Sequence, residues 1–189
     1  MKIFKTFGFI FLLAALFLSN ISHAQPSNEY KAATTELTFN IKGKRLSGFI
    51  YQTAGEGVHP TALLLHGYPG NEKNLDVAQS LRSKGWNVVF FHYRGAWGSE
   101  GEFSFMNAEQ DVQAVLKYLS NKDNAAKLRI NRNLISIIGH SMGGHMAIAG
   151  ILDNPSVNCA IAYDGANMGV NGLGIIDDPK TKIPWKEYS

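Results

Sequence analysis

The sequence predicts an α/β domain with a mostly parallel sheet, flanking helices and an N-terminal hairpin. Two alternating segments come first, and short, nearly continuous apolar runs separated by helical patterns follow them. Alternation is typical of strands with one face in water, whereas continuous apolar runs are typical of parallel strands covered on both faces. The chain has 189 residues, of which 45% are hydrophobic and 17% charged, so we expect one globular domain of this class.

Residues 1–24 have the composition of a secretory signal peptide. Lys2 and Lys5 form its positive start, residues 7–18 are apolar apart from one glycine, and a small residue, Ala24, ends it. The apolar run is shorter than the roughly 20 residues of a membrane span. We therefore expect cleavage after Ala24, export to the periplasm or the medium, and no stable membrane span afterwards. An uncleaved N-terminal anchor is the alternative.

A hairpin follows a polar lead-in at residues 25–34 and opens the domain at residues 35–189. Residues 35–41 and 46–51 alternate apolar and polar side chains, and Gly43 lies between them. Two alternating segments joined by a short link that contains glycine predict two antiparallel strands.

Four further strands are expected at residues 62–65, 88–91, 134–138 and 159–162, which are short and almost entirely apolar. Their composition predicts the parallel, buried part of the sheet. Cys159 begins the last of them, and we expect it to be a small core residue. Because it is the one cysteine of the chain, an intramolecular disulfide and a zinc site of several cysteines are both excluded.

Helices are expected between these strands. In the first helix, one face carries residues 75, 78, 81 and 82, and Gly85 is expected to end the helix. The second is predicted to begin with Asn107 as its cap and Gln110 as the partner in a capping box, with Asp111 near the positive helix end. Its apolar residues follow the spacing of an amphipathic helix and are Val112, Val115, Leu116 and Leu119.

The charge pattern argues against nucleic acid as a partner. The formal net charge is +3, and Lys2 and Lys5 of the expected signal peptide supply two of the positive charges. No cluster of Lys and Arg follows in the rest of the sequence. Phosphate backbones are bound by concentrated positive charge, so we expect no DNA or RNA partner.

In parallel α/β sheets, ligands bind beyond the carboxyl ends of the strands, so the residues after each strand are the candidates for chemistry. Residues 139–144 read GHSMGG, a G-x-S-x-G pattern between a predicted strand and a predicted helix. A serine on so tight a turn needs small neighbours, which Gly139 and Gly143 supply. The turn would lift the Ser141 hydroxyl above the sheet edge, and the N–H of Met142 would point at a developing oxyanion. The alternative is a glycine-rich turn that merely exposes a serine.

Two more loops that contain glycine follow predicted strands. HGYPG at residues 66–70 can turn a backbone N–H, that of Tyr68, toward the same oxyanion position. An ordinary Pro-Gly turn is the alternative for this loop. The loop at residues 92–101 carries three glycines and Trp97, which either borders the substrate pocket or packs on the domain.

These loops together resemble those of the α/β-hydrolase superfamily, most closely its serine aminopeptidase-like and prolyl-oligopeptidase-like branches. The motifs HGYPG, YRGAWGSEG and GHSMGG each stand at a strand end, and the resemblance covers about residues 35–165. It implies that Ser141 is the nucleophile and that Tyr68 and Met142 supply the oxyanion-hole N–H groups. The implied reaction is hydrolysis of an ester, thioester or amide in a small-molecule or peptide substrate. It proceeds through an acyl-enzyme and needs no metal or organic cofactor.

The sequence departs from the family pattern in its histidines. The family order places a catalytic histidine in a late loop after the nucleophile, but the six histidines are at positions 23, 59, 66, 92, 140 and 145. His140 and His145 are too close to Ser141 in sequence for that role, and we expect His66 and His92 to shape their loops. We therefore expect a C-terminally truncated form of a serine hydrolase of the esterase or peptidase type. The alternative is a non-catalytic binding protein that keeps the fold.

The candidate catalytic acid is Asp164, which follows the last predicted strand. In some branches of the superfamily the acid occupies this position, and in most it comes one strand later. A solvated carboxylate in a turn, where Asp is common, is the alternative. Asp177 and Asp178 come later in the chain and are the remaining candidates.

Overall fold

The computed structural model describes residues 30–152 and 154–167. The expected signal peptide, most of the lead-in, and Asp177 and Asp178 lie outside the described residues. Within these ranges, no helix has both the length and the apolar character that crossing a membrane requires.

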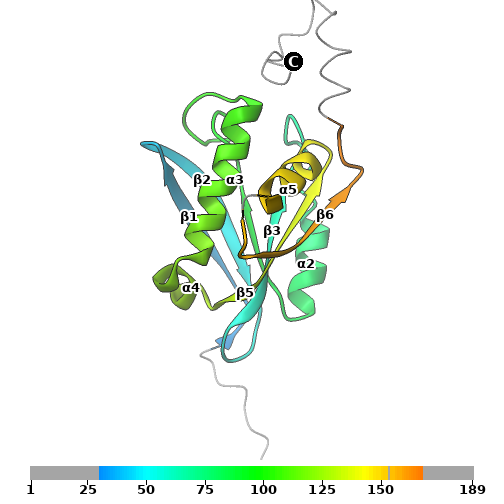
Figure 1. Cartoon of the computed structure of the whole chain (residues 1–189). Helices are drawn as coiled ribbons and strands as arrows, with labels where there is room; N and C mark the ends of the chain where they lie inside the picture. Colours follow the sequence, from blue (N-terminus) through cyan, green and yellow to red (C-terminus); the bar gives the residue numbers. More distant parts are fainter. Residues whose placement is uncertain (1–29, 153, 168–189) are drawn as a thin grey trace, which may run out of the picture. The chain divides into compact units, whose positions relative to one another are not determined.

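One mixed sheet forms the centre of the domain (Figure 1). Its strands are β1 (Ala33–Ile41), β2 (Lys44–Gln52), β3 (His59–Leu65), β4 (Asn87–Phe91), β5 (Ile130–His140) and β6 (Val157–Tyr163). They lie in the order β1-β2-β4-β3-β5-β6, and β4, β3, β5 and β6 run parallel whereas β2 is antiparallel to both of its neighbours. The predicted class, an α/β domain with a mostly parallel sheet and an N-terminal hairpin, is confirmed.

Each predicted strand lies inside an observed strand that extends beyond it. Lys42 and Gly43 join β1 to β2 with φ angles of 50° and 75°, the left-handed pair of a two-residue hairpin turn. β5 exceeds its prediction most, because it begins at Ile130 and its first half contains the polar residues 131–133. The apolar pattern therefore reveals only the second half of β5.

Four helices flank the sheet in the described part of the chain. They are α2 (Leu75–Ser83), α3 (Phe105–Ser120), α4 (Lys122–Leu128) and α5 (Met142–Leu152). α3 and α5 cover one face of the sheet and α2 covers the other (Figure 1). α4 has no counterpart among the predicted helices, because its 7 residues are too few to show a helical period.

The predicted start of α3 at Asn107 is wrong. Ser104 is the cap, and its hydroxyl accepts a hydrogen bond of 3.0 Å from the N–H of Asn107. Serine and asparagine are equally good caps, so residue type alone does not separate them. Gln110 accepts from Arg94 instead of closing a capping box, and Asp111 is fully buried against Arg94 instead of lying at an exposed helix end.

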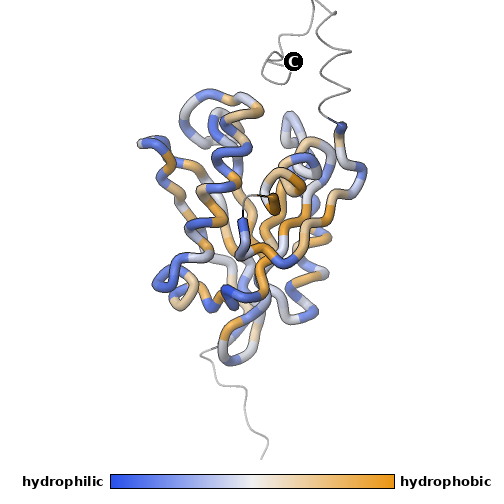
Figure 2. Tube along the Cα trace, in the orientation of Figure 1, coloured by the Kyte–Doolittle hydropathy of each residue, from blue (hydrophilic) through white to orange (hydrophobic). Residues whose placement is uncertain are grey.

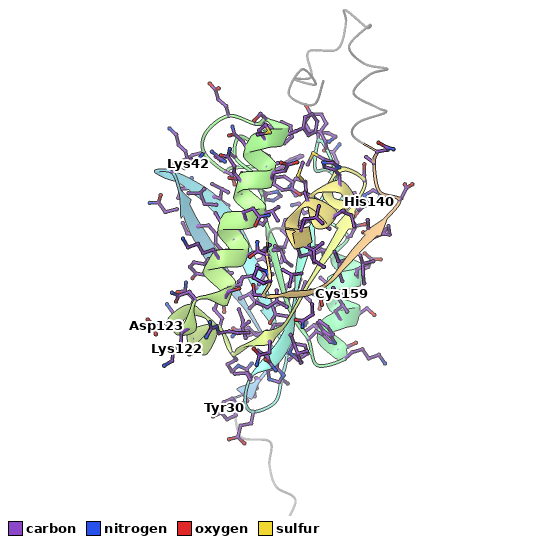
Figure 3. All side chains as sticks on the ribbon, viewed as in Figure 1. Tyr30, Lys42, Lys122, Asp123, His140 and Cys159 are labelled. Atoms are coloured by element: carbon purple, nitrogen blue, oxygen red, sulfur yellow. The ribbon has the colours of Figure 1, made fainter. Side chains whose placement is uncertain are left out.

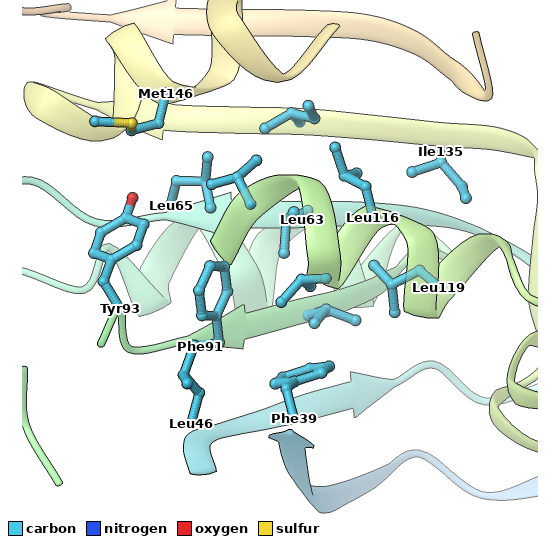
Figure 4. Packing of buried hydrophobic residues seen from close by; sticks show 14 of the residues in the cluster. Phe39, Leu46, Leu63, Leu65, Phe91, Tyr93, Leu116, Leu119, Ile135 and Met146 are labelled. Carbon is cyan, nitrogen blue, oxygen red and sulfur yellow. The ribbon is translucent and has the colours of Figure 1, made fainter. Parts of the chain in front are cut away.

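The larger part of the core lies between the sheet and the helices α3 and α5. Figure 4 shows its side chains interlocking, with Phe39, Leu63 and Phe91 from the strands and Leu116 from α3. A smaller cluster, which includes Ala78, fills the space between the sheet and α2. The hydropathy colours place the hydrophobic residues mainly along the central strands (Figure 2).

The expectation that Cys159 belongs to the core is wrong. Cys159 lies on β6 and is exposed (Figure 3). β6 is the outermost strand of the described sheet on this side, so it has a strand neighbour on one edge only. Ile161 on the same strand is also 48% exposed.

Candidate active site

A tight turn carries Ser141 between the end of β5 and the start of α5. The φ angle of Ser141 is 54°, in the left-handed region, and the predicted tight turn is present. A Cβ on Gly139 would lie 1.9 Å from the carbonyl oxygen of Gly143, so no larger residue fits there. A non-glycine residue at such an angle costs free energy, and strain of this kind clusters at functional sites.

The end of β3 packs against this turn. A Cβ on Gly143 would lie 2.4 Å from the carbonyl oxygen of Leu65. A Cβ on Gly67 would lie 3.0 Å from the Cβ of Ser141 and 3.5 Å from its hydroxyl oxygen. Both glycines therefore allow the HGYPG loop to approach Ser141 closely. Tyr68, the predicted oxyanion donor, is the next residue of that loop.

Met142 is the first residue of α5 and is buried. N–H groups in the first turn of a helix lack partners within the helix and carry the positive end of its dipole. The carbonyl oxygen of Ser141 is held by the N–H groups of Gly144 and Ala166, both at 2.9 Å. Ala166 comes after β6, so the chain returns to the elbow and fixes its backbone.

His66 holds the HGYPG loop from the protein interior. Its Nδ1 donates a hydrogen bond of 2.7 Å to the carbonyl oxygen of Gly67, and the hydroxyl of Tyr93 donates to the His66 carbonyl oxygen at 3.2 Å. A Cβ on Gly70 would lie 2.7 Å from the imidazole ring. Burial lowers the pKa of His66, which keeps the ring neutral at pH 7. This geometry fits the loop-shaping role that the sequence suggested.

A buried ion pair anchors the loop at residues 92–101. Nε of Arg94 lies 2.6 Å from Oδ1 of Asp111, and the backbone N–H of Arg94 donates to Oδ2 at 2.8 Å. Burial raises the pKa of Asp111, and the contacts from Arg94 act in the opposite direction. From this anchored loop the indole Nε1 of Trp97 donates to the carbonyl oxygen of Pro69 at 2.9 Å. The second loop therefore braces the HGYPG loop.

His92 lies just after β4, beside His66, and the two ring centroids are 5.2 Å apart. Burial, together with smaller electrostatic effects of His66 and Lys73, lowers the pKa of His92 to about 4. The carbonyl oxygen of His92 accepts from the hydroxyl of Ser99 at 2.7 Å. His92 thus contributes to the conformation of its loop.

Asp164 follows β6 at the same edge of the sheet as Ser141. Its side chain is 91% exposed, and its Oδ2 lies 3.8 Å from Nε2 of His140. His140 is the last residue of β5 and lies beside β6 (Figure 3).

The second histidine near Ser141 also faces a carboxylate, since Nε2 of His145 lies 3.5 Å from Oε1 of Glu109. Neither of these contacts involves the Ser141 hydroxyl, so both nearby histidines have other partners.

Two pockets lie at the loops around the elbow, one with Gly67 in its lining and the other with His140. The first has a volume of about 300 Å³, and its lining includes Tyr68, Trp97 and Phe103. The second has a volume of about 680 Å³ and is lined by residues 71–76 and His140. Across the described ranges, no three His, Cys, Asp or Glu side chains are grouped so that they could hold a metal ion.

Comparison with protein families decides the classification of this site. The profile of the BD-FAE family matches residues 53–170, which include the HGYPG loop, the loop of Trp97 and the elbow of Ser141. The chain belongs to the BD-FAE family.

Two curated relatives of this BD-FAE chain are similar in sequence over part of their length. The probable beta-galactosidase C of Neosartorya fischeri is 34% identical over 121 residues, which are 60% of this chain and 11% of that protein. The lysophosphatidylserine lipase ABHD12 of Danio rerio is 31% identical over 100 residues, which are 51% of this chain and 24% of that protein. The chain thus spans about a quarter or less of these two relatives.

Solved structures identify the fold of this BD-FAE member as that of the α/β-hydrolases. The α/β hydrolase GrgF from Penicillium sp. sh18 matches with a TM-score of 0.60 at 18% identity, over 77% of this chain and 52% of that one. An esterase from Pyrococcus furiosus matches with a TM-score of 0.61 at 24% identity, over 87% of this chain and 63% of that one. The predicted α/β-hydrolase superfamily is confirmed by the family match and the fold.

Two contacts at this BD-FAE site were not predicted from the sequence. One is the hydrogen bond from Trp97 to Pro69, which joins two loops with no sequence pattern in common. The other is the stacking of His140 on Tyr163, with ring centroids 5.2 Å apart. The second contact had a signal, because the two residues end neighbouring parallel strands and are paired in register.

Proposed function

We propose that this protein is an exported serine hydrolase that cleaves an ester or amide bond through an acyl-enzyme on Ser141. The observation that carries the proposal is the backbone of Ser141, held at φ 54° with Gly67 of the HGYPG loop against it. Such a turn presents a nucleophile next to backbone N–H donors, which is the arrangement that acyl transfer needs. Membership of a hydrolase family with a lipase among its relatives supports the same reaction.

In the proposed reaction, the hydroxyl oxygen of Ser141 bonds to the acyl carbon while a base takes its proton. The acyl oxygen becomes an oxyanion, to which the N–H groups of Tyr68 and Met142 donate. Each such donor contributes about 3 kcal/mol to the transition state. The bond to the alcohol or amine then breaks, the leaving group takes the proton, and water releases the acid from Ser141.

The proposed base is a histidine supplied by a longer natural chain. His140 faces Asp164, His145 faces Glu109, and no histidine follows residue 145 in the sequence. The chain covers 52% of GrgF and 63% of the Pyrococcus furiosus esterase. Asp164 remains the candidate acid, since it lies at the sheet edge of Ser141 and its exposed carboxylate can still accept a partner.

The proposed acyl pocket is the smaller one. Tyr68, Trp97 and Phe103 line it, and the rings of Tyr68 and Phe103 lie 4.9 Å apart. Burial of an apolar acyl group against aromatic side chains is favourable, and Gly67 in the same lining touches Ser141. A small acyl group would therefore reach the nucleophile from this pocket.

The proposal that the protein is exported rests on the composition of residues 1–24. Expression of the full-length gene and mass spectrometry of the exported protein test it. A mature chain that begins at Gln25 is expected, and a chain that keeps Met1 in the membrane fraction would favour the N-terminal anchor.

Labelling of the full-length gene product with a fluorophosphonate probe tests Ser141. We expect the wild type and the control Ser83→Ala to be labelled, and Ser141→Ala to remain unlabelled. Ser83 is exposed at the end of α2 and bonds only to the carbonyl oxygen of Ser80 among the described residues, so it controls for the loss of a hydroxyl elsewhere. Equal labelling of the wild type and Ser141→Ala would contradict the proposal, as would a folded wild type that is not labelled.

A non-catalytic binding protein is the second candidate function. The observation that favours it is that His140 and His145 both face carboxylates. The nucleotide sequence after codon 189 separates the two functions. A reading frame that continues to a further histidine supports the hydrolase, and a genuine stop codon there supports the binding protein.

A further inference from the structure

The amino end of the sheet carries a concentration of positive charge. β3, β4, β5 and β6 run parallel, so their first residues meet at this end and the elbow of Ser141 lies at the opposite one. The segments at the amino end supply seven cationic side chains, which are Lys31, Arg82, Lys84, Lys122, Lys127, Arg129 and Arg132. They supply two described carboxylates, those of Glu56 and Asp123, and Asp153 in the sequence adds a third. The seven cationic residues define the basic end of the domain.

The carboxyl end of the sheet has the opposite balance of charge. Its cations are Lys42, Lys44, Arg45, Lys73 and Arg94, and its carboxylates are Glu72, Asp76, Glu100, Glu102, Glu109, Asp111 and Asp164. Figure 3 labels Lys122 and Asp123 at one end of the domain and Lys42 at the other. The cations of the basic end come from separate segments of the chain, so the sequence shows no run of Lys and Arg and folding alone gathers them.

The lysines of the basic end are available to a partner. All four are exposed, and they are Lys31, Lys84, Lys122 and Lys127. None of the four forms an ion pair with a carboxylate of the described residues. Unpaired charges of one sign raise the potential of a surface and attract a partner of the opposite sign. The basic end therefore fits a polyanion.

Two hollows at the basic end each have one arginine and no carboxylate in their lining. One has a volume of about 380 Å³, and its lining includes Arg132, Ser120, Ser156 and two asparagines. Nε of Arg132 donates to the carbonyl oxygen of Ser120 at 2.6 Å, which holds the guanidinium beside this hollow. The other has a volume of about 330 Å³ and is lined by Arg82 together with two hydroxyl side chains. Guanidinium, hydroxyl and amide groups donate hydrogen bonds to phosphate oxygens, so each hollow suits a phosphodiester headgroup.

The place where the chain enters the domain favours a membrane over other polyanions. Lys31 comes just before β1, whose Ala33 pairs with Gln52 at the basic end. The apolar run at residues 7–18 is therefore joined by the chain to this end. Whether residues 1–24 are a signal peptide during export or an uncleaved anchor, the basic end is the one connected to the membrane. Val58, which is 57% exposed in the loop between β2 and β3, adds an apolar side chain there.

We propose that the basic end binds the surface of an anionic phospholipid bilayer, an inference whose choice of partner rests on the proposed export and not on the reaction of Ser141. The ammonium groups lie against the headgroups, and the two arginine hollows take phosphate oxygens. Each Lys or Arg close to an anionic surface strengthens binding by about fivefold. Because Ser141 lies at the opposite end of the sheet, the bound protein holds its elbow toward the aqueous phase.

Cosedimentation with vesicles tests the surface on the full-length gene product without residues 1–24. Their removal keeps every described strand and helix, and it prevents the apolar run from binding vesicles by itself. We expect binding to vesicles of equal parts phosphatidylglycerol and phosphatidylcholine, and binding at least about tenfold weaker to phosphatidylcholine alone. Salt at about 1 M, which shortens the Debye length to about 3 Å, should release the protein. Equal binding to both kinds of vesicle overturns the proposal.

The double variant Lys122→Gln and Lys127→Gln removes two charges of the basic end. Both lysines are exposed on α4, so we expect the variant to fold, which thermal unfolding checks. Its affinity for the anionic vesicles should fall at least about tenfold. The matched control, Lys42→Gln with Lys44→Gln, removes the same charge from the carboxyl end and should keep the wild-type affinity. Equal losses in the two double variants would overturn the basic end as the binding surface.

Two competitors separate the bilayer from other anionic partners. Inorganic phosphate, added at constant ionic strength, tests whether the hollows bind the free anion, and we expect it to leave the protein on the vesicles. A short DNA duplex at the same phosphate concentration tests nucleic acid, and we expect it to bind more weakly than the vesicles. Displacement of the protein by either competitor overturns the lipid surface as the partner.

Fluorophosphonate labelling keeps this inference distinct from the proposed reaction. Ser141→Ala should bind anionic vesicles as the wild type does, because the substitution lies at the opposite end of the sheet. Vesicle binding by a wild type that is never labelled would overturn the hydrolase and retain the basic end. Labelling of a wild type that does not bind anionic vesicles would retain the hydrolase and overturn the basic end.

Discussion

The indole Nε1 of Trp97 donates a 2.9 Å hydrogen bond to the carbonyl oxygen of Pro69, and this bond joins the two loops that border the aromatic pocket. Trp97 itself is anchored through its loop, because Arg94 is held by buried Asp111. The HGYPG loop is thus positioned from outside by a residue that is 54% exposed. The sequence offered two alternatives for Trp97, and the structure combines them. Trp97 borders the aromatic pocket and also bonds to the HGYPG loop of the domain.

Trp97→Phe keeps an aromatic ring and removes the N–H donor. We expect the rate of fluorophosphonate labelling at Ser141 to fall roughly fivefold, because a lost hydrogen bond of about 1 kcal/mol loosens the proposed oxyanion loop. Trp86→Phe is the matched control, since Trp86 packs on the cluster beneath α2. An unchanged labelling rate in Trp97→Phe would show that the HGYPG loop keeps its position without this bond.

Gly139→Ala is expected to destabilise the fold by about 3 kcal/mol or more, because its Cβ would lie 1.9 Å from the backbone oxygen of Gly143. Urea unfolding followed by circular dichroism measures the loss. Gly43→Ala in the β1–β2 turn is the control. The added Cβ would have no neighbour within 4 Å. We therefore expect a loss of only about 1 kcal/mol, the conformational cost of a non-glycine residue at a φ angle of 75°. Equal losses for the two variants would contradict the close packing of the elbow.

Asp111→Ala leaves the buried guanidinium of Arg94 without its carboxylate. We expect the free energy of unfolding to fall by about 3–5 kcal/mol, because an unpaired buried charge is costly. The exposed pair of Arg45 and Glu100, at 3.4 Å, provides the comparison. Glu100→Ala should have a far smaller effect, since water screens that pair. The proposed anchoring of the loop fails if the two variants are equally stable.

His92 predicts a specific dependence of stability on pH. Its folded-state pKa of about 4 lies below the ordinary value of 6.5, so the unfolded chain binds a proton more readily in this interval. This contribution to stability is complete above pH 6.5 and is lost as the pH falls toward 4. Burial also lowers the pKa of His66, which acts in the same direction.

The measurement is urea unfolding across that pH interval for the wild type and His92→Gln. The free energy of unfolding should decline with falling pH in both proteins and decline less steeply in the variant. His59→Gln is the control, because His59 lies at the start of β3 and away from this pair. Identical slopes for the wild type and His92→Gln would exclude His92 as a source of the pH dependence.

The strands and the elbow could be predicted because their signals are local. Apolar runs mark β3 to β6, and glycine spacing around Ser141 marks the turn. The role of Asp111 could not be predicted, because Arg94 is 17 residues away in sequence and only the folded structure brings the two side chains together. The exposure of Cys159 depends on the place of β6 in the sheet order, which strand composition does not encode. Ser104 and Asn107 are equally good caps, so the start of α3 required the structure.

The amide of Ala166 has a consequence for the order of events during synthesis. It holds the carbonyl oxygen of Ser141 at 2.9 Å, yet it follows β6 in the chain. While the nascent chain extends only as far as α5, the turn at Ser141 therefore lacks the hydrogen bond from Ala166. The backbone of residue 141 gains this second hydrogen bond only when translation has delivered the segment beyond β6, so the turn is completed after most of the sheet has been synthesised.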